Sequence, residues 1–429
     1  MEIEGIPLEK LKYSLFLRRR FLPIFLATSL GSFNDNLLRS GLVVLIAYAS
    51  IKGITLPARP EILVTICSAL LVIPSLLFSF IAGQVADKFE KSQLVIFTKI
   101  AEVLIMVCVY YGFATQNITL LMVMLFISGT HSAFYGPIKF SILPEHLKRN
   151  ELLAANGFMA GGSYLAIMLG MVTGGLLVEM PGNAIGTAAV SIAVIGLLAS
   201  LRIPHSKPAH PEMDVSYNIW RGSISMIGFA TKNKRLLYSI IALSWFLMIG
   251  SVYMSQFPNY AQAVVRGNNE VYILFLTTFT VGVAIGSLLC DTLLEGKISG
   301  KLTRWAALGV SLFSYGMIML TPEPVHEGLM TAAEYLADQR HWPVLLSMVL
   351  TAVSGGMYMV PLYAVLQSET QSTHRSRVLA ASNFSDSVFI TFAALVSALL
   401  LYYGLGVKDL FIVLASFNLL AVWYARKIT

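Results

Sequence analysis

The sequence places ionisable and amide side chains inside a long apolar run, at Asn34, Asp35, Asn36 and Arg39. Asp35 lies about 14 residues into this run, which is about 21 Å along a helix, so a spanning helix holds it near the middle of a bilayer. Ionisable groups at that depth are costly and usually line a substrate or ion pathway. The carboxylate accepts hydrogen bonds and the amides both donate and accept, so the group suits a polar ligand. It equally suits an interhelical hydrogen-bond cluster, or an ion pair between Asp35 and Arg39.

Three more ionisable residues lie in apolar runs of the first half. Lys139 is near the end of its run, where a cation can hold a phosphate or extend to the headgroup layer. Glu102 lies about one helical turn from Lys99 and can pair with it. His131 is either a hydrogen-bonded packing residue or the natural group for proton coupling.

The remaining candidates are mostly amides, with one further acid. Asp386 is the most costly of them to bury, which favours a pathway role over a structural pair. Asn156 and Asn383 fall at a similar level of their own runs. Gln256 stands two residues before Pro258, and this proline predicts a kink or break in its helix.

The elements that must position these residues are apolar helices. The chain is 56% hydrophobic and only 12% charged, and its mean hydropathy is +0.72. In water such a composition would leave large apolar patches exposed, so we expect an all-α membrane protein. Twelve runs approach or exceed the roughly 18 residues that cross a bilayer. They are residues 21–48, 62–86, 93–115, 118–140, 152–178, 184–203, 236–262, 271–291, 302–320, 342–366, 378–402 and 407–425.

Charge distribution predicts the orientation. Most of the 30 Lys and Arg residues fall in the segments that share a side with the N-terminus. Positive residues concentrate on the cytoplasmic side, so both termini are expected there, after an even number of crossings. The net charge of +7 then reflects membrane orientation rather than nucleic-acid binding. The first twenty residues are too charged for a signal peptide.

A polar, proline-containing stretch divides the chain into two halves. We expect a six-helix bundle over residues 1–203, a cytoplasmic linker over 204–235 and a second six-helix bundle over 236–429. Within the linker, residues 219–230 could form an amphipathic surface helix. The other long loop, residues 321–341, could hold a short helix at 329–339.

Two sequence blocks repeat between the halves. Residues 137–145 run from proline to glutamate with matching apolar positions at 361–369, and Leu-Ala-Ala-Asn at 153–156 resembles 379–383. Both pairs have nearly the same separation. This pattern predicts a parallel six-helix repeat, which is typical of transporters that bind their substrate between two halves.

The segment from Gly83 to Lys91 reads G-x-x-x-D-K-x-x-K. Gly83 would let two helices approach closely, Asp87 would accept charge-assisted bonds from a neighbouring helix end, and Lys88 and Lys91 would anchor the cytoplasmic face. The simpler interpretation is a charge cluster that sets topology. The pattern resembles the loop between helices two and three of the major facilitator superfamily, and the resemblance implies a conformational role for these four residues.

A closer resemblance covers nearly the whole chain. It rests on F-N-D-N at 33–36, G-Q-V-A-D-K-F-E-K-S at 83–92, F-Y-G-P-I-K-F-S-I-L-P-E-H-L at 134–147 and L-L-A-A-N-G at 152–157. Together these are similar to the lysophospholipid transporters, and in particular to the transporter domain that some bacteria fuse to an acyltransferase and an acyl-carrier-protein synthetase.

The family implies a flippase of the bacterial inner membrane that works by alternating access. It would move lysophosphatidylethanolamine or lysophosphatidylglycerol to the cytoplasmic leaflet for reacylation. Lys139 matches a lysine of the family pattern. The solitary members carry an arginine in helix seven, whereas Arg266 here falls in an outside loop. Expected partners are the lysophospholipid, membrane lipids and possibly a cytoplasmic acyltransferase or acyl-carrier-protein synthetase, with the chain acting as a monomer.

Two other functions stay open on the sequence. One is a proton-coupled drug or metabolite exporter of the same fold, and the other is a docking subunit for an acyltransferase that transports nothing. An enzyme is not expected, because the chain to Thr429 lacks the common ATP-binding, serine-nucleophile and acyltransferase motifs. No cofactor or metal is expected either, since the three cysteines (Cys67, Cys108 and Cys290) lack metal-ligand spacing.

Overall fold

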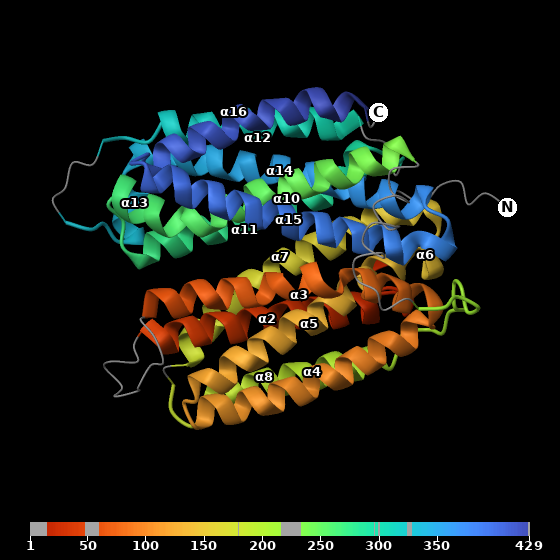
Figure 1. Cartoon of the computed structure of the whole chain (residues 1–429). Helices are drawn as coiled ribbons and strands as arrows, with labels where there is room; N and C mark the ends of the chain where they lie inside the picture. Colours follow the sequence, from red (N-terminus) through yellow and green to blue (C-terminus); the bar gives the residue numbers. More distant parts are fainter. Residues whose placement is uncertain are drawn as a thin grey trace. The chain divides into compact units, whose positions relative to one another are not determined.

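Twelve long helices account for most of the part of the chain that the structure describes. This computed structural model describes residues 15–47, 60–178, 180–215, 233–295, 297–298, 301–323 and 328–427, without the side chains of residues 47, 60–62, 64, 65 and 68. The long helices (Figure 1) are α2 (Leu22–Ala47), α3 (Pro60–Lys88), α4 (Lys91–Ala114), α5 (Ile118–Ser141), α7 (Leu152–Leu177), α8 (Ala184–Ser200), α10 (Lys234–Asn259), α11 (Asn269–Leu293), α12 (Lys301–Met319), α14 (Trp342–Glu369), α15 (Arg375–Tyr402) and α16 (Val407–Tyr424). Each of the twelve predicted runs is confirmed within a few residues.

Length and hydropathy make these helices membrane spans. Among the described residues, nine helices are long and apolar enough to cross a bilayer, and α8 is a shorter apolar helix. Large apolar side chains such as Phe97, Leu104 and Leu395 remain more than 60% exposed. In water this exposure would be costly, but lipid chains are as apolar as the side chains themselves. The chain is a multi-pass membrane protein.

Short polar residues define where several helices begin. The side chain of Asn117 accepts the N–H of Leu120 at 3.0 Å at the start of α5, and Asn233 does the same for Arg235 at the start of α10. Such caps satisfy N–H groups that have no partner inside the helix. These caps fix where the helices begin, because the apolar residues inside the helices do not mark a starting point.

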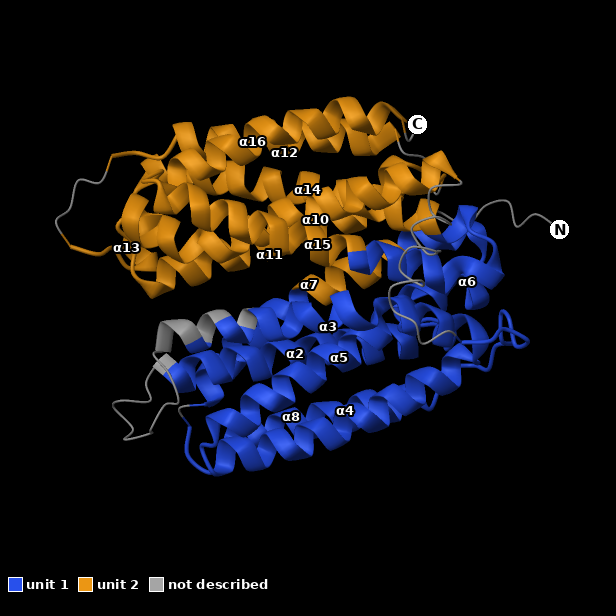
Figure 2. Cartoon of the chain, viewed as in Figure 1, with its two compact units in different colours: residues 1–155, 165–232, 367–384 blue, residues 156–164, 233–366, 385–429 orange. Residues whose placement is uncertain are grey.

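The contacts divide the chain into two units (Figure 2). The first comprises residues 1–155, 165–232 and 367–384, and the second comprises 156–164, 233–366 and 385–429. The first unit therefore includes the end of α14 and the start of α15. The domain boundaries predicted at residues 203 and 235 stay a prediction, and the possible helix at 219–230 lies outside the described residues.

Glycines bring α2 and α7 into backbone contact within the first unit. A Cβ added to Gly170 would lie 2.3 Å from the carbonyl oxygen of Phe33, and one added to Gly174 would lie 2.4 Å from that of Leu37. No side chain fits at either position, as in other helix seams built from small residues four apart. This seam lies on either side of residues 34–36 and fixes the position of that turn of α2.

Two features of the second unit were expected from proline and loop patterns. The long loop contains the short helix α13 (Ala332–Ala337), whose Tyr335 is fully buried and stacks on His341 with ring centroids 4.1 Å apart. Beyond Pro258, α10 continues into a π-helical turn, η2, at Tyr260–Val264. Such turns are rare and mark a local change of helix geometry.

Candidate functional site

Asp35 lies in the middle of α2 and is bound by two serines of α5. Ser128 Oγ donates to Oδ1 of Asp35 at 2.5 Å, and Ser132 Oγ donates to Oδ2 at 2.5 Å. The serines are four residues apart, so one face of α5 presents one hydroxyl to each carboxylate oxygen. Asp35 itself is only partly buried. Within the described part of the chain, no lysine or arginine forms an ion pair with it.

A fully buried ion pair on α4 lies beside this aspartate. Lys99 Nζ is 2.6 Å from Oε2 of Glu102, and the two side chains are 0% and 3% exposed. Asn34 donates from Nδ2 to Oε1 of Glu102 and to the carbonyl oxygen of Ala189 in α8, both at 3.2 Å. The pairing of Glu102 with Lys99 that the sequence allowed is confirmed, and Asn34 connects it to α2.

His131 occupies the same level of α5, between the two serines. Its ring is nearly parallel to that of Tyr135, with centroids 6.1 Å apart. Both ring nitrogens are buried, and the main chain of Thr98 on α4 lies close enough to act on the ring. Tyr135 in turn is hydrogen-bonded to Thr28 at 2.9 Å and lies under the Lys99 ammonium, 5.1 Å from its ring centroid. Both interpretations of His131, a hydrogen-bonded packing residue and a proton-coupling group, stay predictions.

These residues form what we call the mid-span cluster. It consists of Asn34, Asp35, Lys99, Glu102, Ser128, His131, Ser132 and Tyr135. It contains two carboxylic acids and one lysine, so it carries an excess negative charge when both acids are ionised and His131 is neutral. An unbalanced charge at this depth attracts a cation or a proton.

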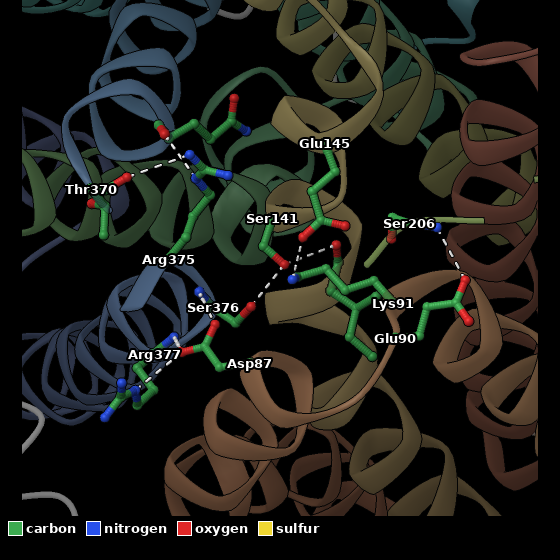
Figure 3. A network of polar contacts seen from close by, with 12 residues as sticks. Asp87, Glu90, Lys91, Ser141, Glu145, Ser206, Thr370, Arg375, Ser376 and Arg377 are labelled. Carbon is green, nitrogen blue, oxygen red and sulfur yellow. Dashed lines mark hydrogen bonds and ion pairs between the residues drawn. The ribbon is translucent and has the colours of Figure 1, made fainter. Parts of the chain in front are cut away.

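A second polar network lies at one end of the first unit (Figure 3), and we call it the end network. Its centre is Asp87 at the end of α3, whose carboxylate is fully buried. Oδ1 accepts the N–H of Ser376 at 2.9 Å, and Oδ2 accepts the N–H of Arg377 at 3.3 Å and its Nε at 3.1 Å. The acid thus binds unpaired N–H groups in the first turn of α15, where the helix dipole also favours a negative charge.

Gly83 explains why Asp87 reaches α15. A Cβ on Gly83 would lie 2.7 Å from Cβ of Ala380 and 3.0 Å from Cα of Arg377. Only glycine allows this approach, and Asp87 stands one turn further along the same face of α3. The spacing of Gly83 and Asp87 thus lets α15 pack closely against α3 and bind its carboxylate. The conformational role of these residues stays a prediction.

The loop after α3 extends the end network. Lys91, 1% exposed, forms an ion pair with Glu145 in the short helix α6 (Leu143–His146), and Lys88 lies 5.9 Å from the ring centroid of Phe89. Glu90 accepts the N–H of Ser206 at 3.1 Å, and Nδ1 of His205 lies 2.8 Å from the same carboxylate. Burial would raise the pKa of Glu90, but the hydrogen bonds from Ser92, His205 and Ser206 hold it below its usual value.

The other predicted residues of the first unit lie on α2, α5 and the start of α15. Asn36 donates to the carbonyl oxygen of Ser32 at 2.8 Å, a bond within its own helix. Arg39 acts electrostatically on Cys67 of α3. Lys139 lies 5.1 Å from the ring centroid of Phe140, near the end of α5. Asn383 packs against α5, with its Nδ2 2.5 Å from the position a Cβ on Gly136 would take.

Three predicted residues belong to the second unit. Asp386 accepts a hydrogen bond from Ser244 Oγ at 2.6 Å, and the Oγ atoms of Ser244 and Ser385 are 2.8 Å apart. Asn156 is buried on α7. Gln256 lies in the last turn of α10 and accepts from Asn259 at 2.9 Å. The second unit thus has its own buried acid, which accepts a hydrogen bond from a serine hydroxyl.

Sequence reasoning missed Ser128, Ser132, Ser376 and Arg377. The two serines share the helical period with His131, so a polar stripe Ser128, His131, Ser132, Tyr135 along one helix was the available signal. Ser376 and Arg377 were detectable only as the first turn of a helix, whose N–H groups need an acceptor from elsewhere.

The arrangement of helices and the match of its sequence define the class of protein. Residues 21–337 match the family model described as Major Facilitator Superfamily. The chain belongs to this superfamily of membrane transporters.

Similar proteins narrow the comparison. Over 424 residues the chain is 25% identical to the lysophospholipid transporter LplT of Escherichia fergusonii, covering 94% of this chain and 95% of that relative. Its fold is similar to that of the human organic anion transporter TETRAN (TM-score 0.70, 14% identity, 98% of this chain and 100% of that one). It is also similar to FucP, a transporter of the superfamily in the outward conformation (TM-score 0.69, 14% identity, 96% and 100%). The resemblance to lysophospholipid transporters is confirmed.

Proposed function

We propose that this protein is a lysophospholipid flippase of a bacterial inner membrane. It moves lysophosphatidylethanolamine and lysophosphatidylglycerol to the cytoplasmic leaflet, where they are reacylated. The observation that carries this proposal is the similarity to a curated lysophospholipid transporter along 94% of the chain. Both termini lie on the cytoplasmic side, as the distribution of lysine and arginine predicts.

The chemistry of the head group fits the polar residues of the first unit. A lysophospholipid carries a phosphate, a glycerol hydroxyl and, in the ethanolamine form, an ammonium. Asp35 offers a carboxylate near mid-span for the hydroxyl or ammonium, and Lys139 offers a cation for the phosphate. Asn36 and Arg39 add an amide and a second cation on α2. The acyl chain stays in contact with lipid throughout, because burying it in a polar site would be unfavourable.

The end network supports alternating access. Asp87 holds the first turn of α15 through three hydrogen bonds, and Gly83 permits the contact. Such a cluster of charge-assisted bonds has two discrete arrangements, made and broken, as a conformational switch requires. Breaking it allows the ends of α14 and α15 to separate from α3 during the transport cycle.

A reconstituted flip assay tests the proposal. Purified protein in liposomes is given fluorescent lysophosphatidylethanolamine, lysophosphatidylglycerol or the matching diacyl lipid, and a dye-quenching reagent reports the leaflet. We expect both lysolipids to cross at rates well above protein-free liposomes, and the diacyl lipid to stay behind. Flipping without a partner protein also excludes a pure docking subunit.

The variant Asp35→Ala tests the site within the same assay. We expect at least a tenfold loss of rate, because the remaining amides cannot replace the carboxylate. Gly175→Ala is a matched control, since its added Cβ meets nothing closer than 3.7 Å. A full rate in Asp35→Ala would remove Asp35 from the site, and equal rates with and without protein would refute the function.

A further inference from the structure

Basic residues from two distant parts of the chain meet at the end of the first unit that holds the end network. They come from the turn that precedes α2 and from the segment between α6 and α7. The two segments are in contact, because Nη1 of Arg20 donates to the carbonyl oxygen of His146 at 3.4 Å. We call these cations the basic patch, which consists of Arg18, Arg19, Arg20, Lys148 and Arg149.

One acid, Glu151, lies within the basic patch. It forms ion pairs with Arg20 and, at 3.6 Å, with Arg18. Its Oε2 also accepts the N–H of Lys148 at 2.8 Å. Five cations and one acid leave the patch with a formal charge of +4. Like charges this close repel one another, so an anion that enters the patch stabilises the fold.

Three of the cations face outward. Arg19, Lys148 and Arg149 are exposed, and none of the three forms an ion pair within the part of the chain that the structure describes. Glu145 of α6 does not serve them, because it is already paired with Lys91. The patch therefore presents its excess charge to an anion from outside the protein.

The position of the patch indicates that this anion comes from the membrane. The α2 helix begins at Leu22, just after the three arginines, so they lie where the chain enters the bilayer. In the same turn Leu17 is 73% exposed, whereas Leu15 and Phe21 are buried. An apolar side chain beside cations suits the headgroup layer, because the leucine contacts acyl chains there while the cations contact phosphates. A soluble anion would leave Leu17 in water.

We propose that the basic patch binds the phosphodiester head group of an acidic phospholipid in the adjoining leaflet. The guanidinium groups match phosphate oxygens with two parallel hydrogen bonds, Lys148 adds a point charge, and Leu17 contacts an acyl chain. The distribution of lysine and arginine places this leaflet on the cytoplasmic side.

The bound lipid is a fixed contact and not the transported molecule. It joins the turn before α2 to the segment before α7, so the stability of the first unit depends on the lipids around it. The site does not rest on the proposed lysophospholipid transport.

Native mass spectrometry measures the bound lipid directly. The purified protein is freed of lipid in a neutral detergent and titrated with diacyl phosphatidylglycerol or with phosphatidylcholine of equal chain length. We expect phosphatidylglycerol to bind at least about tenfold more tightly, and its affinity to fall as the salt concentration rises, because salt screens exposed charges. Equal affinities for the two lipids would overturn the proposal.

A double variant tests the outward cations. Lys148→Gln with Arg149→Gln leaves the pair of Arg20 with Glu151 in place. Each basic residue at an anionic surface contributes about fivefold in affinity, so this variant should bind phosphatidylglycerol about 25-fold more weakly. The matched control, Lys234→Gln with Lys297→Gln, removes two exposed lysines of the second unit and should keep the wild-type affinity. Equal losses in both double variants would show a general attraction to the protein surface and would overturn the site.

Leu17→Ser distinguishes a lipid from a free phosphate. The substitution leaves the charge unchanged and should weaken phosphatidylglycerol binding by about threefold or more, because the contact with an acyl chain is lost. Inorganic phosphate at the same concentration should not displace the lipid. Displacement by phosphate, or a wild-type affinity in Leu17→Ser, would overturn the lipid assignment. Since these measurements involve no transport, their failure leaves the proposed flippase function untouched.

Discussion

Two aspartates of the first unit, Asp35 and Asp87, show how the same side chain is used differently inside one membrane protein. Asp87 is fully buried and meets an arginine as well as two helix N–H groups. Asp35 is partly buried and accepts hydrogen bonds from two serines of α5, with His131 between them in the sequence. A carboxylate that is neutralised on all sides holds helices together, whereas one that is only solvated can exchange a proton. The two aspartates therefore differ in their donors, which are a cation and helix N–H groups at Asp87 and serine hydroxyl groups at Asp35.

The largest effect should come from the ion pair that lets Asp35 remain the unbalanced acid. Lys99→Met leaves Glu102 charged and buried without its cation, which should lower the free energy of unfolding by about 3–5 kcal/mol. Thermal unfolding in detergent measures the loss. The double variant Lys99→Met with Glu102→Gln removes both charges and should recover most of the stability. A single variant as stable as the wild type would contradict the account of this pair.

Next in size is the loss of charge at Asp87. Asp87→Asn breaks the charge-assisted bonds to Arg377 and the first turn of α15, at a cost of about 1.5–3 kcal/mol. Asp409→Asn is a matched control, because Asp409 accepts the N–H of Gly406 at 2.9 Å at an exposed helix start, where asparagine caps equally well. Unfolding temperatures compare the two variants. Equal shifts would show that the cation adds nothing at Asp87.

A smaller loss of stability is expected at Gly83, whose missing side chain lets Asp87 reach its partners. Gly83→Ala forces apart Ala380 and the backbone of Arg377, and overpacking of this kind costs about 1–3 kcal/mol. Gly175→Ala makes the same change where the added Cβ meets only ordinary contacts, none closer than 3.7 Å, and should be neutral or slightly stabilising, since alanine favours helix. The measurement is the unfolding temperature together with the flip rate. If both variants behave alike, the close approach at Gly83 is not required.

The smallest effect concerns Glu90. Its pKa is held below the usual value, so its hydrogen bonds stabilise the fold above the unfolded-state pKa, and this contribution is lost as pH falls through the lowered folded-state pKa. Glu90→Gln should therefore unfold at a lower temperature than the wild type at pH 7.5, and the gap should close below about pH 4. Glu295→Gln, in an exposed pair with Lys297, should show no gap at either pH. If the difference in unfolding temperature instead widens as the pH falls, the hydrogen bonds of Glu90 do not stabilise its charged form.

The helices could all be predicted from the sequence, but only some of the residues in the two polar networks could. Hydropathy alone located all twelve long helices, because a bilayer demands long apolar runs. Asp35 was recognised because an acid at that depth is costly, Asp87 because it stands in the G-x-x-x-D-K-x-x-K pattern, and Lys99 because it shares a helix with Glu102. Ser128 and Ser376 were missed, because a serine in a helix is too common to signal a contact. Their partners lie far away in the sequence, at Asp35 and Asp87.

Both members of the buried pair at Lys99 and Glu102 lie on α4, three residues apart, and this bears on how the protein is made. A single charge in the centre of a helix costs about 2.5–3.5 kcal/mol when the helix enters the membrane. Charges that meet on the same helix can pair before any other helix arrives, so α4 enters the bilayer already neutralised. Asn34 and the rest of the cluster then assemble around this pair. The pair itself forms without waiting for later helices to be inserted.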